Sequence, residues 1–232
     1  MKNKKIMFVT PYFYPKVGGL ENYAYNIALG LKEKYNWEVV IVTSNHENPK
    51  EYKEETIKGM KVYRLPRLLK VSNTPINPMW YFHIKKIIKS EQPNIINGHS
   101  PVPFIADVAA RLANRMKIPF ILTYHNDLSK DNKILNSIAK SYYLLQGNKT
   151  LKIVNRIIAT SYYYMKNSSH IAKYEDKVEI ISPGTYLSKN TKSKVKEEFI
   201  LFVGQLDKTH SHKGLDYLLE ALSKTEKINL KI

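Results

Sequence analysis

Short apolar runs alternate along the chain with segments of helical periodicity. Residues 5–10 form an apolar run that ends at Pro11, and residues 37–43 contain four consecutive apolar positions. Between them, apolar side chains recur at the spacing of one helix face: Leu20, Tyr23, Ala24, Ile27, Ala28 and Leu31. Strands that are apolar on both faces are typical of a parallel sheet covered by helices on its two sides.

The same alternation continues to about residue 181. Strands are predicted at 61–65, 94–98, 119–124, 156–160 and 178–181, and helices at 79–90, 104–116 and 132–145. Strands and helices that alternate in this way build βαβ units, so the pattern predicts an α/β fold with a doubly wound, Rossmann-like parallel sheet. Ligands of such sheets bind at the carboxyl ends of the strands, which directs attention to the loops there.

A polar segment rich in lysine and serine divides the chain. It covers residues 185–198 and lacks periodicity, as a linker does. We therefore predict an N-terminal domain over 1–184 and, over 199–232, the truncated start of a second Rossmann-like domain. That start comprises a strand at 199–203, a helix from 215 to about 224 and a strand at 228–232. Parallel βα elements bury both faces against neighbours, so we expect this second domain to be incomplete.

Composition excludes several kinds of chemistry. The 232 residues include no cysteine, which excludes disulfides, thiolate metal sites and a cysteine nucleophile. The N-terminal apolar run is too short for a signal peptide, and no run is long enough to span a bilayer, so a cytoplasmic location is predicted. A net charge of +17 favours anionic partners, although the scattered lysines weigh against nucleic acid.

Two basic amphipathic segments, 81–89 and 132–152, mix aromatic and aliphatic residues with lysines. Such segments can lie on an anionic membrane, which predicts peripheral contact with the inner face of the membrane. The alternative is an ordinary helix that packs on the core and keeps its lysines in water.

A glycine pair, Gly18 and Gly19, separates the first predicted strand from the first helix. Glycine lets a backbone approach a phosphate, and a helix N-terminus offers amide donors to it. The spacing matches neither the dinucleotide fingerprint nor a Walker A loop, so a tight turn is the alternative interpretation.

Two histidines, His99 and His125, lie at the ends of later strands. His125 follows an apolar run at the mouth of the predicted crevice, where an imidazole can contact a ligand hydroxyl or stabilise developing charge. His99 could also bind a ligand hydroxyl, and its alternative role is to satisfy backbone groups in a turn.

In the second domain, Lys213 and Gly214 precede a predicted helix. A lysine ammonium and helix amides together can hold a diphosphate. His210 and His212 are spaced like metal ligands, but no further ligand cluster accompanies them, so no metal site is predicted.

In their order and spacing, these segments resemble the family-four group of retaining GT-B glycosyltransferases. The matching stretches are 15–21, 92–99, 119–125, 157–161, 180–185 and 199–222. The resemblance implies two facing Rossmann-like domains, of which the first binds mainly the acceptor and the second mainly a nucleotide sugar. It also implies that protein charges and helix dipoles neutralise the leaving diphosphate, so no metal or other cofactor is expected.

The resemblance also implies the residues of the donor side. Gly18 and Gly19 would approach the donor phosphates, and Lys213 would hold the diphosphate. Gln205 stands where the family usually has an arginine, which removes one cationic contact unless Lys208 or His210 replaces it. The family's turn before the linker is usually Asn-Gly and here is Pro-Gly, and the later segment that binds the ribose and donor sugar is absent.

Around the transferring sugar, the resemblance assigns the catalytic contact to His125. We further expect Glu21, His99 and Asn126 to contact the acceptor or the sugar. The leading hypothesis is a glycosyltransferase that moves a sugar from a nucleotide diphosphate sugar to a glycan or lipid-linked acceptor, inactive as this chain alone. The alternatives are a non-catalytic acceptor-binding module that needs a separate donor-binding partner, and a basic membrane-surface domain.

Overall fold

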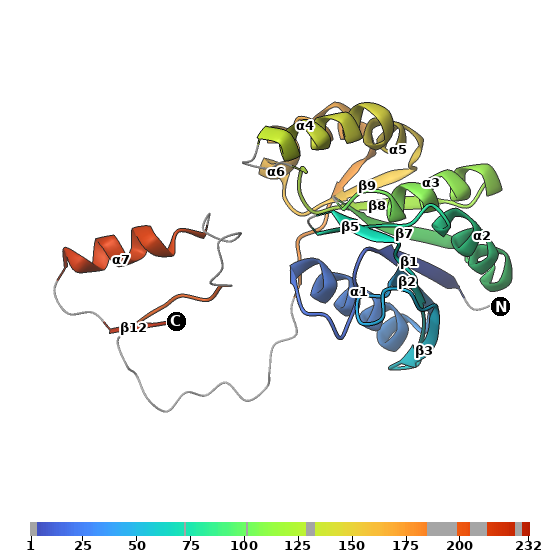
Figure 1. Ribbon diagram of the computed structural model, residues 1–232, viewed down its shortest axis with the longest axis horizontal. Coiled ribbons are helices and arrows are strands. Elements are labelled where there is room, and N and C mark those ends of the chain that lie inside the picture. Colours follow the sequence, from blue (N-terminus) through green and yellow to red (C-terminus); the bar gives the residue numbers. More distant parts are fainter. Residues whose placement is uncertain are drawn as a thin grey trace. The chain divides into compact units, whose positions relative to one another are not determined.

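The computed structural model describes residues 4–71, 73–100, 102–128, 133–184, 199–204, 213–225 and 229–232 (Figure 1). The chain divides into two compact units, Met1–Thr185 and Tyr186–Ile232. The first unit contains the large sheet and most of the helices.

An eight-stranded sheet forms the centre of the first unit, in the order β10-β9-β8-β7-β1-β2-β4-β3. Its strands are β1 (Lys5–Thr10), β2 (Glu38–Ser44), β3 (Lys53–Ile57), β4 (Met60–Leu65), β7 (Ile95–Ser100), β8 (Phe120–Tyr124), β9 (Arg156–Ala159) and β10 (Val178–Ile180). All neighbours are parallel except β3 and β4, which form an antiparallel pair. The predicted doubly wound α/β fold is therefore confirmed.

Helices cover both faces of this sheet. They are α1 (Gly19–Tyr35), α2 (Trp80–Glu91), α3 (Ile105–Met116), α4 (Lys133–Tyr142), α5 (Asn148–Ile153) and α6 (Tyr162–Asn167), with a π-helical turn η1 (Tyr143–Gly147) between α4 and α5 and a 3₁₀ segment η2 (Ala172–Lys177). Side chains of β1 alternate between the two layers, as a period of two requires. Phe8 packs in the cluster that contains Ala24 of α1, whereas Met7 packs in the cluster that contains Ile84 of α2 and Ala109 of α3.

Several elements differ from the sequence-based expectations. The strand β3 was not predicted, because its sequence is mostly polar. The short hairpin of β5 (Leu69–Val71) and β6 (Thr74–Ile76) was also missed, as were α6 and η2. The helix expected at 132–145 extends further: α4 passes through η1 into α5 and ends at Ile153.

The second unit contains β11 (Phe199–Leu201), α7 (Leu215–Ser223) and β12 (Asn229–Lys231). The two strands pair in parallel, as expected for a βαβ unit. Gly214 precedes α7 with φ of 77°, a left-handed conformation that glycine adopts without strain. No residue of α7 is buried. The predicted linker at 185–198 lies outside the described residues.

Candidate functional site

The carboxyl ends of β1, β7 and β8 lie next to one another, because these three strands are neighbours in the sheet. The loop after β1 carries Gly18 and Gly19, β7 carries His99, and His125 follows β8 directly. The fold thus brings together groups that are separated by more than 100 residues in the sequence.

The glycine pair forms the N-terminus of α1, with Gly18 as the cap and Gly19 as the first helical residue, where the backbone amides lack helical partners. A side chain on Gly18 would collide with Glu21, since a Cβ there would lie 2.2 Å from the carboxylate Oε2 atom. A Cβ on Gly19 would meet no atom within 4 Å. Gly18 therefore makes room for the Glu21 carboxylate, and Gly19 borders open space beside the helix N-terminus.

Glu21 is predominantly buried in that first turn, with 8% of its surface exposed. Its Oε1 atom lies 3.7 Å from the Nζ atom of Lys16, in the loop after β1. Glu21, which was predicted to contact the acceptor, thus already forms an ion pair with Lys16 of the preceding loop.

His99 and His125 are in direct contact. The Nδ1 atom of His99 lies 3.0 Å from the Nε2 atom of His125, and their rings stack with centroids 5.3 Å apart. Tyr23 of α1 meets the His125 ring edge-on at 5.1 Å. His99 is completely buried, whereas His125 is half-buried, so in this arrangement His125 is the one of the two that reaches the crevice.

Both imidazoles are neutral near pH 7. Burial lowers the pKa of His125 to about 4. Burial, reinforced by the neighbouring His125, lowers the pKa of His99 well below its usual value. Within the hydrogen-bonded pair, one ring nitrogen must carry a proton and the other must accept it. Because Nε2 of His125 is used in this contact, its Nδ1 is the nitrogen left for a ligand.

The segment after β8 is held in place by Asp127. Its Oδ1 atom accepts hydrogen bonds from the hydroxyls of Tyr124 at 2.7 Å and Ser168 at 2.6 Å. One residue further, the Leu128 amide donates to the hydroxyl of Tyr143 at 3.0 Å. These contacts fix the segment that carries His125 and the exposed Asn126. Sequence reasoning did not assign Asp127 this role, since its partner Ser168 is 41 positions away in the chain.

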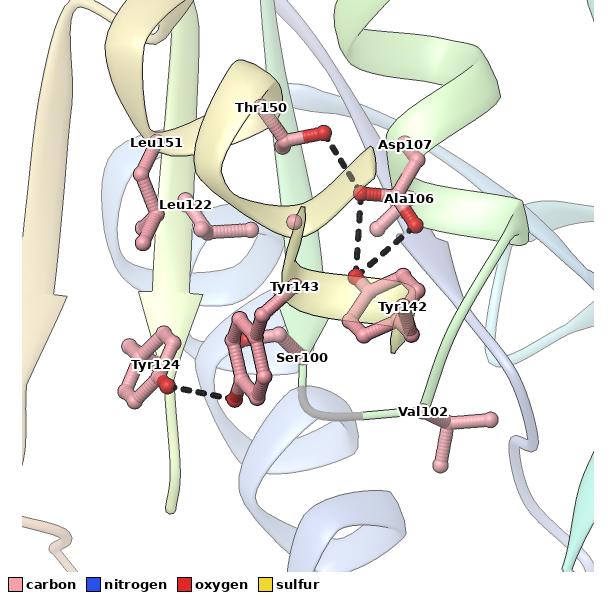
Figure 2. Close-up of a pocket in the computed structure, with 11 residues that line it drawn as sticks. Ser100, Val102, Ala106, Asp107, Leu122, Tyr124, Tyr142, Tyr143, Thr150 and Leu151 are labelled. Carbon is pink, nitrogen blue, oxygen red and sulfur yellow. Dashed lines mark hydrogen bonds between the residues drawn. The ribbon is translucent and has the colours of Figure 1, made fainter. Parts of the chain in front are cut away.

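A small cavity of about 10 Å³ lies behind this segment, between α3 and η1 (Figure 2). At its wall, Asp107 accepts hydrogen bonds from Thr150 at 2.5 Å, from Tyr142 at 3.0 and 3.1 Å and from the Phe104 amide at 2.8 Å. Burial raises the pKa of this carboxyl. The space has room for about one water molecule, so the cavity cannot hold a sugar. Asp107 joins the start of α3 to the π-helical turn.

The predicted diphosphate lysine belongs to the second unit. A Cβ on Gly204, three residues after β11, would lie 3.1 Å from Cδ of Lys213, so the lysine stem passes over this glycine. The arrangement resembles a glycine-lined phosphate site at a helix start. Gln205, Lys208, His210 and His212 lie outside the described residues.

The residues that the structure describes contain no group of three or more histidine, aspartate or glutamate side chains placed to hold a metal ion. No helix within the described ranges is both long enough and apolar enough to cross a membrane.

A doubly wound parallel sheet with a glycine pair after its first strand defines the Rossmann-like class of domain from which GT-B glycosyltransferases are built. The chain belongs to Glycosyltransferase Family 4, whose family model matches residues 17–189. This confirms the resemblance seen in the sequence.

Known proteins similar to the chain agree with this assignment. O-antigen chain mannosyltransferase C of Escherichia coli is 26% identical over 95% of the chain, and one human subunit of phosphatidylinositol N-acetylglucosaminyltransferase is 32% identical over 54% of it. Sucrose-phosphate synthase from Thermosynechococcus elongatus has a similar fold, with a TM-score of 0.63 and 15% identity over 98% of this chain and 61% of that structure. The chain spans 58% of the E. coli protein and 26% of the human one.

Proposed function

We propose that the whole protein transfers a sugar from a nucleotide diphosphate sugar to a glycan or lipid-linked acceptor. The observation that carries this proposal is the neutral His125, held by His99 and Tyr23 at the carboxyl edge beside the open space at Gly19. This edge is where doubly wound sheets bind their ligands, and the chain belongs to a glycosyltransferase family.

In this proposal, His125 contacts the transferring sugar through a hydrogen bond. A neutral imidazole donates or accepts a hydrogen bond to a sugar hydroxyl, and at pH 7 it brings no full positive charge. Asn126, exposed beside it, adds an amide that can bind a second hydroxyl. His99 acts through His125 rather than on the ligand, because its ring is completely buried.

Backbone amides and a lysine are the groups that we propose to bind the donor diphosphate. Gly18 and Gly19 offer backbone approach at the N-terminus of α1, and Lys213 offers an ammonium beside Gly204. Gln205 would add a neutral amide. With these groups we propose catalysis without a metal ion or other cofactor.

The acceptor side is proposed to work at a membrane surface. The similar human protein is named for phosphatidylinositol, a lipid, and the present chain has a net charge of +17. On the segment from α4 to α5, Leu144 and Leu145 expose 74% and 69% of their surfaces, with Lys140, Lys149 and Lys152 exposed nearby in the sequence. This mixture of apolar and basic groups suits peripheral contact with the inner face of a membrane.

The test is calorimetric binding and turnover with UDP- and GDP-sugars. It compares this chain with a version extended through a complete second Rossmann-like domain. We expect only the extended version to bind a donor and transfer its sugar, because both substrates must be positioned together. In that version, His125→Ala should lower kcat by roughly 100-fold or more, the scale of a lost catalytic side chain. Lys213→Ala should weaken donor binding.

The matched control is His83→Gln on α2, whose ring stacks on Tyr52 at the β3 end of the sheet, several strands from β8 and His125, and which should leave turnover unchanged. Failure of the extended version to bind any nucleotide sugar would contradict the proposal. It would favour a non-catalytic acceptor-binding module that works with a separate donor-binding partner.

A further inference from the structure

Cationic side chains gather at the carboxyl edge beside the glycine pair. None of them is among the residues proposed to bind the donor. The Nζ atom of Lys16, in the loop after β1, lies 3.1 Å from the ring centroid of Tyr12 and 3.7 Å from Glu21 Oε1. The hydroxyl of Tyr12 donates to the Asn73 carbonyl at 3.2 Å. This bond ties the β5–β6 hairpin, which carries Lys70, to the same loop.

Arg67 follows β4 and joins this group. Its amide donates to the Pro49 carbonyl at 2.7 Å, which fixes the start of the hairpin. Burial lowers the pKa of Lys16, and the positive charges of Lys70 and Arg67 lower it further against the opposing pull of Glu21. Lys16 is therefore close enough to both Arg67 and Lys70 to be repelled by them. We call Lys16, Arg67 and Lys70 the edge cations.

Only one of the edge cations forms an ion pair within the described ranges. Among the described residues, Glu21 pairs with Lys16, while neither Arg67 nor Lys70 has an ion-pair partner. The nearby Glu55 is already used, since it accepts from the Nε atom of the buried Arg64 at 2.5 Å. The Nη1 atom of Arg64 is buried and unpartnered in the described structure. The unpaired charges of the half-buried Arg67 and the exposed Lys70 make the local potential positive, which favours binding of an anion.

The chemistry of the edge cations fits a phosphate. Arginine offers a planar set of donors that matches phosphate oxygens, and lysine adds point charges. β1 and β8 are two strands, or about 10 Å, apart in the sheet, and Lys16 lies in the loop after β1 at the same carboxyl edge as His125. One molecule can thus place a hydroxyl near His125 and a phosphate near Lys16.

Exposed apolar side chains alternate with the edge cations in the sequence. Val17 and Leu68 expose 70% and 71% of their surfaces, and Leu69 and Val71 expose 45% and 43%. Apolar side chains that gather on a surface mark contact with an apolar partner. A phosphate attached to a lipid satisfies both the charges and the apolar groups.

We propose that Lys16, Arg67 and Lys70 bind the phosphate of a lipid phosphate acceptor, with Val17, Leu68, Leu69 and Val71 against its lipid part. This inference rests on the proposed function, because it takes the bound lipid phosphate to be the acceptor of the sugar. It adds the chemical class of that acceptor.

The test measures binding of this chain to phosphatidylcholine vesicles that contain phosphatidic acid, by co-sedimentation. The triple variant Lys16→Gln/Arg67→Gln/Lys70→Gln is compared with Lys58→Gln/Lys89→Gln/Lys117→Gln. The control removes the same charge from exposed residues at the opposite, amino-terminal edge of the sheet. We expect the edge-cation variant to bind about tenfold more weakly than the control, because only it loses direct phosphate contacts.

Equal losses in the two variants would overturn the inference, since they would show that only the overall charge attracts the vesicles. A second arm follows the amide NMR signals of Lys16 and Arg67 during titration with glycerol 3-phosphate. A response to this soluble ester without any vesicle difference would overturn the lipid part of the proposal. Neither readout involves sugar transfer, so failure here is distinguishable from failure of the proposed function.

Discussion

The contact between His99 and His125 determines how part of the protein's stability responds to pH. His125 has a pKa of about 4 in the folded protein, below the ordinary value of 6.5. The unfolded chain therefore binds more protons than the folded one between these two values. Stability from the neutral His125 is complete above about pH 6.5 and is lost as the pH falls toward 4.

We predict that the free energy of unfolding falls more steeply with acid in the wild type than in His125→Gln. Between pH 7.5 and 4.5 the wild type should lose about 2 kcal/mol more of its free energy of unfolding than the variant does. This value follows from roughly 1.4 kcal/mol for each pKa unit. Urea denaturation at several pH values measures it. His46, His83 and His170 also have lowered pKa values, but they are present in both proteins and cancel. His99 adds to the difference in the same direction, because His125 helps to lower its pKa in the wild type only. Parallel curves for the two proteins would show that His125 is not held neutral.

The sequence could indicate the individual groups of the crevice but not their contacts. Gly18, Gly19 and His125 follow apolar runs, so their place at the carboxyl edge could be predicted from strand ends. The burial of His99 and the anchoring role of Asp127 depend on side chains far away in the chain, and no local pattern reveals them. The edge cations were missed for the same reason, since Lys16 and Arg67 are 51 positions apart.

The π-helical turn η1 places one additional residue in the helix between α4 and α5. Its hydrogen bonds join residues five positions apart, whereas those of an α-helix join residues four apart. Tyr142 before the turn and Thr150 after it both donate to Asp107 (Figure 2). They are eight positions apart, whereas two turns of a regular α-helix take about seven. The additional residue is therefore absorbed by the turn, and the exposed Leu145 lies within it.

Deletion of Leu145 should convert this segment to a continuous α-helix with both hydroxyls still facing Asp107. We expect a change in the free energy of unfolding of less than about 1 kcal/mol, because no buried contact is lost. Deletion of Ala110 from the regular helix α3 serves as the control. It turns the rest of α3 by about 100°, removes Leu112 and Ala113 from the core, and should prevent stable folding. Chemical denaturation of both variants distinguishes these outcomes, and equal loss of stability would contradict the interpretation of η1.

Most helices and strands could be predicted because their apolar positions are regular. β1, β2 and β8 contain apolar runs, and α1, α2 and α3 have a clear apolar face. β3 was missed because an edge strand can be polar on much of its surface. The additional residue in η1 breaks helical periodicity, so the helix beyond residue 145 was invisible to a rule based on 3.6 residues per turn.

The edge strands of the sheet affect whether the protein self-associates in solution. β3 is an edge strand whose sequence begins Lys53-Glu54-Glu55, and Lys53 pairs with Glu55 at 2.8 Å. Charged side chains on an edge strand prevent it from pairing with the edge of another molecule. The net charge of +17 adds a general repulsion between molecules.

The double variant Lys53→Val/Glu54→Val should self-associate, since it leaves the net charge unchanged and adds an apolar edge strand. Sedimentation velocity at increasing concentration measures the association. The control Lys86→Val/Lys89→Val places two valines on exposed positions of α2, where no strand edge is available. Association of the control to the same extent would mean that added apolar surface or lost charge, and not strand pairing, is responsible.

The position of β1 in the middle of the sheet has a consequence for biosynthesis. β1 pairs on one side with β2 and on the other with β7, where Ile6 lies opposite Ile95. At 5–20 residues per second, a ribosome needs on the order of 5–20 s to make the residues between these two partners. During that interval the edge of β1 that later pairs with β7 has no partner strand. We expect nascent molecules of this protein to depend on chaperones at that point, before β7 emerges, more than at any later point of translation.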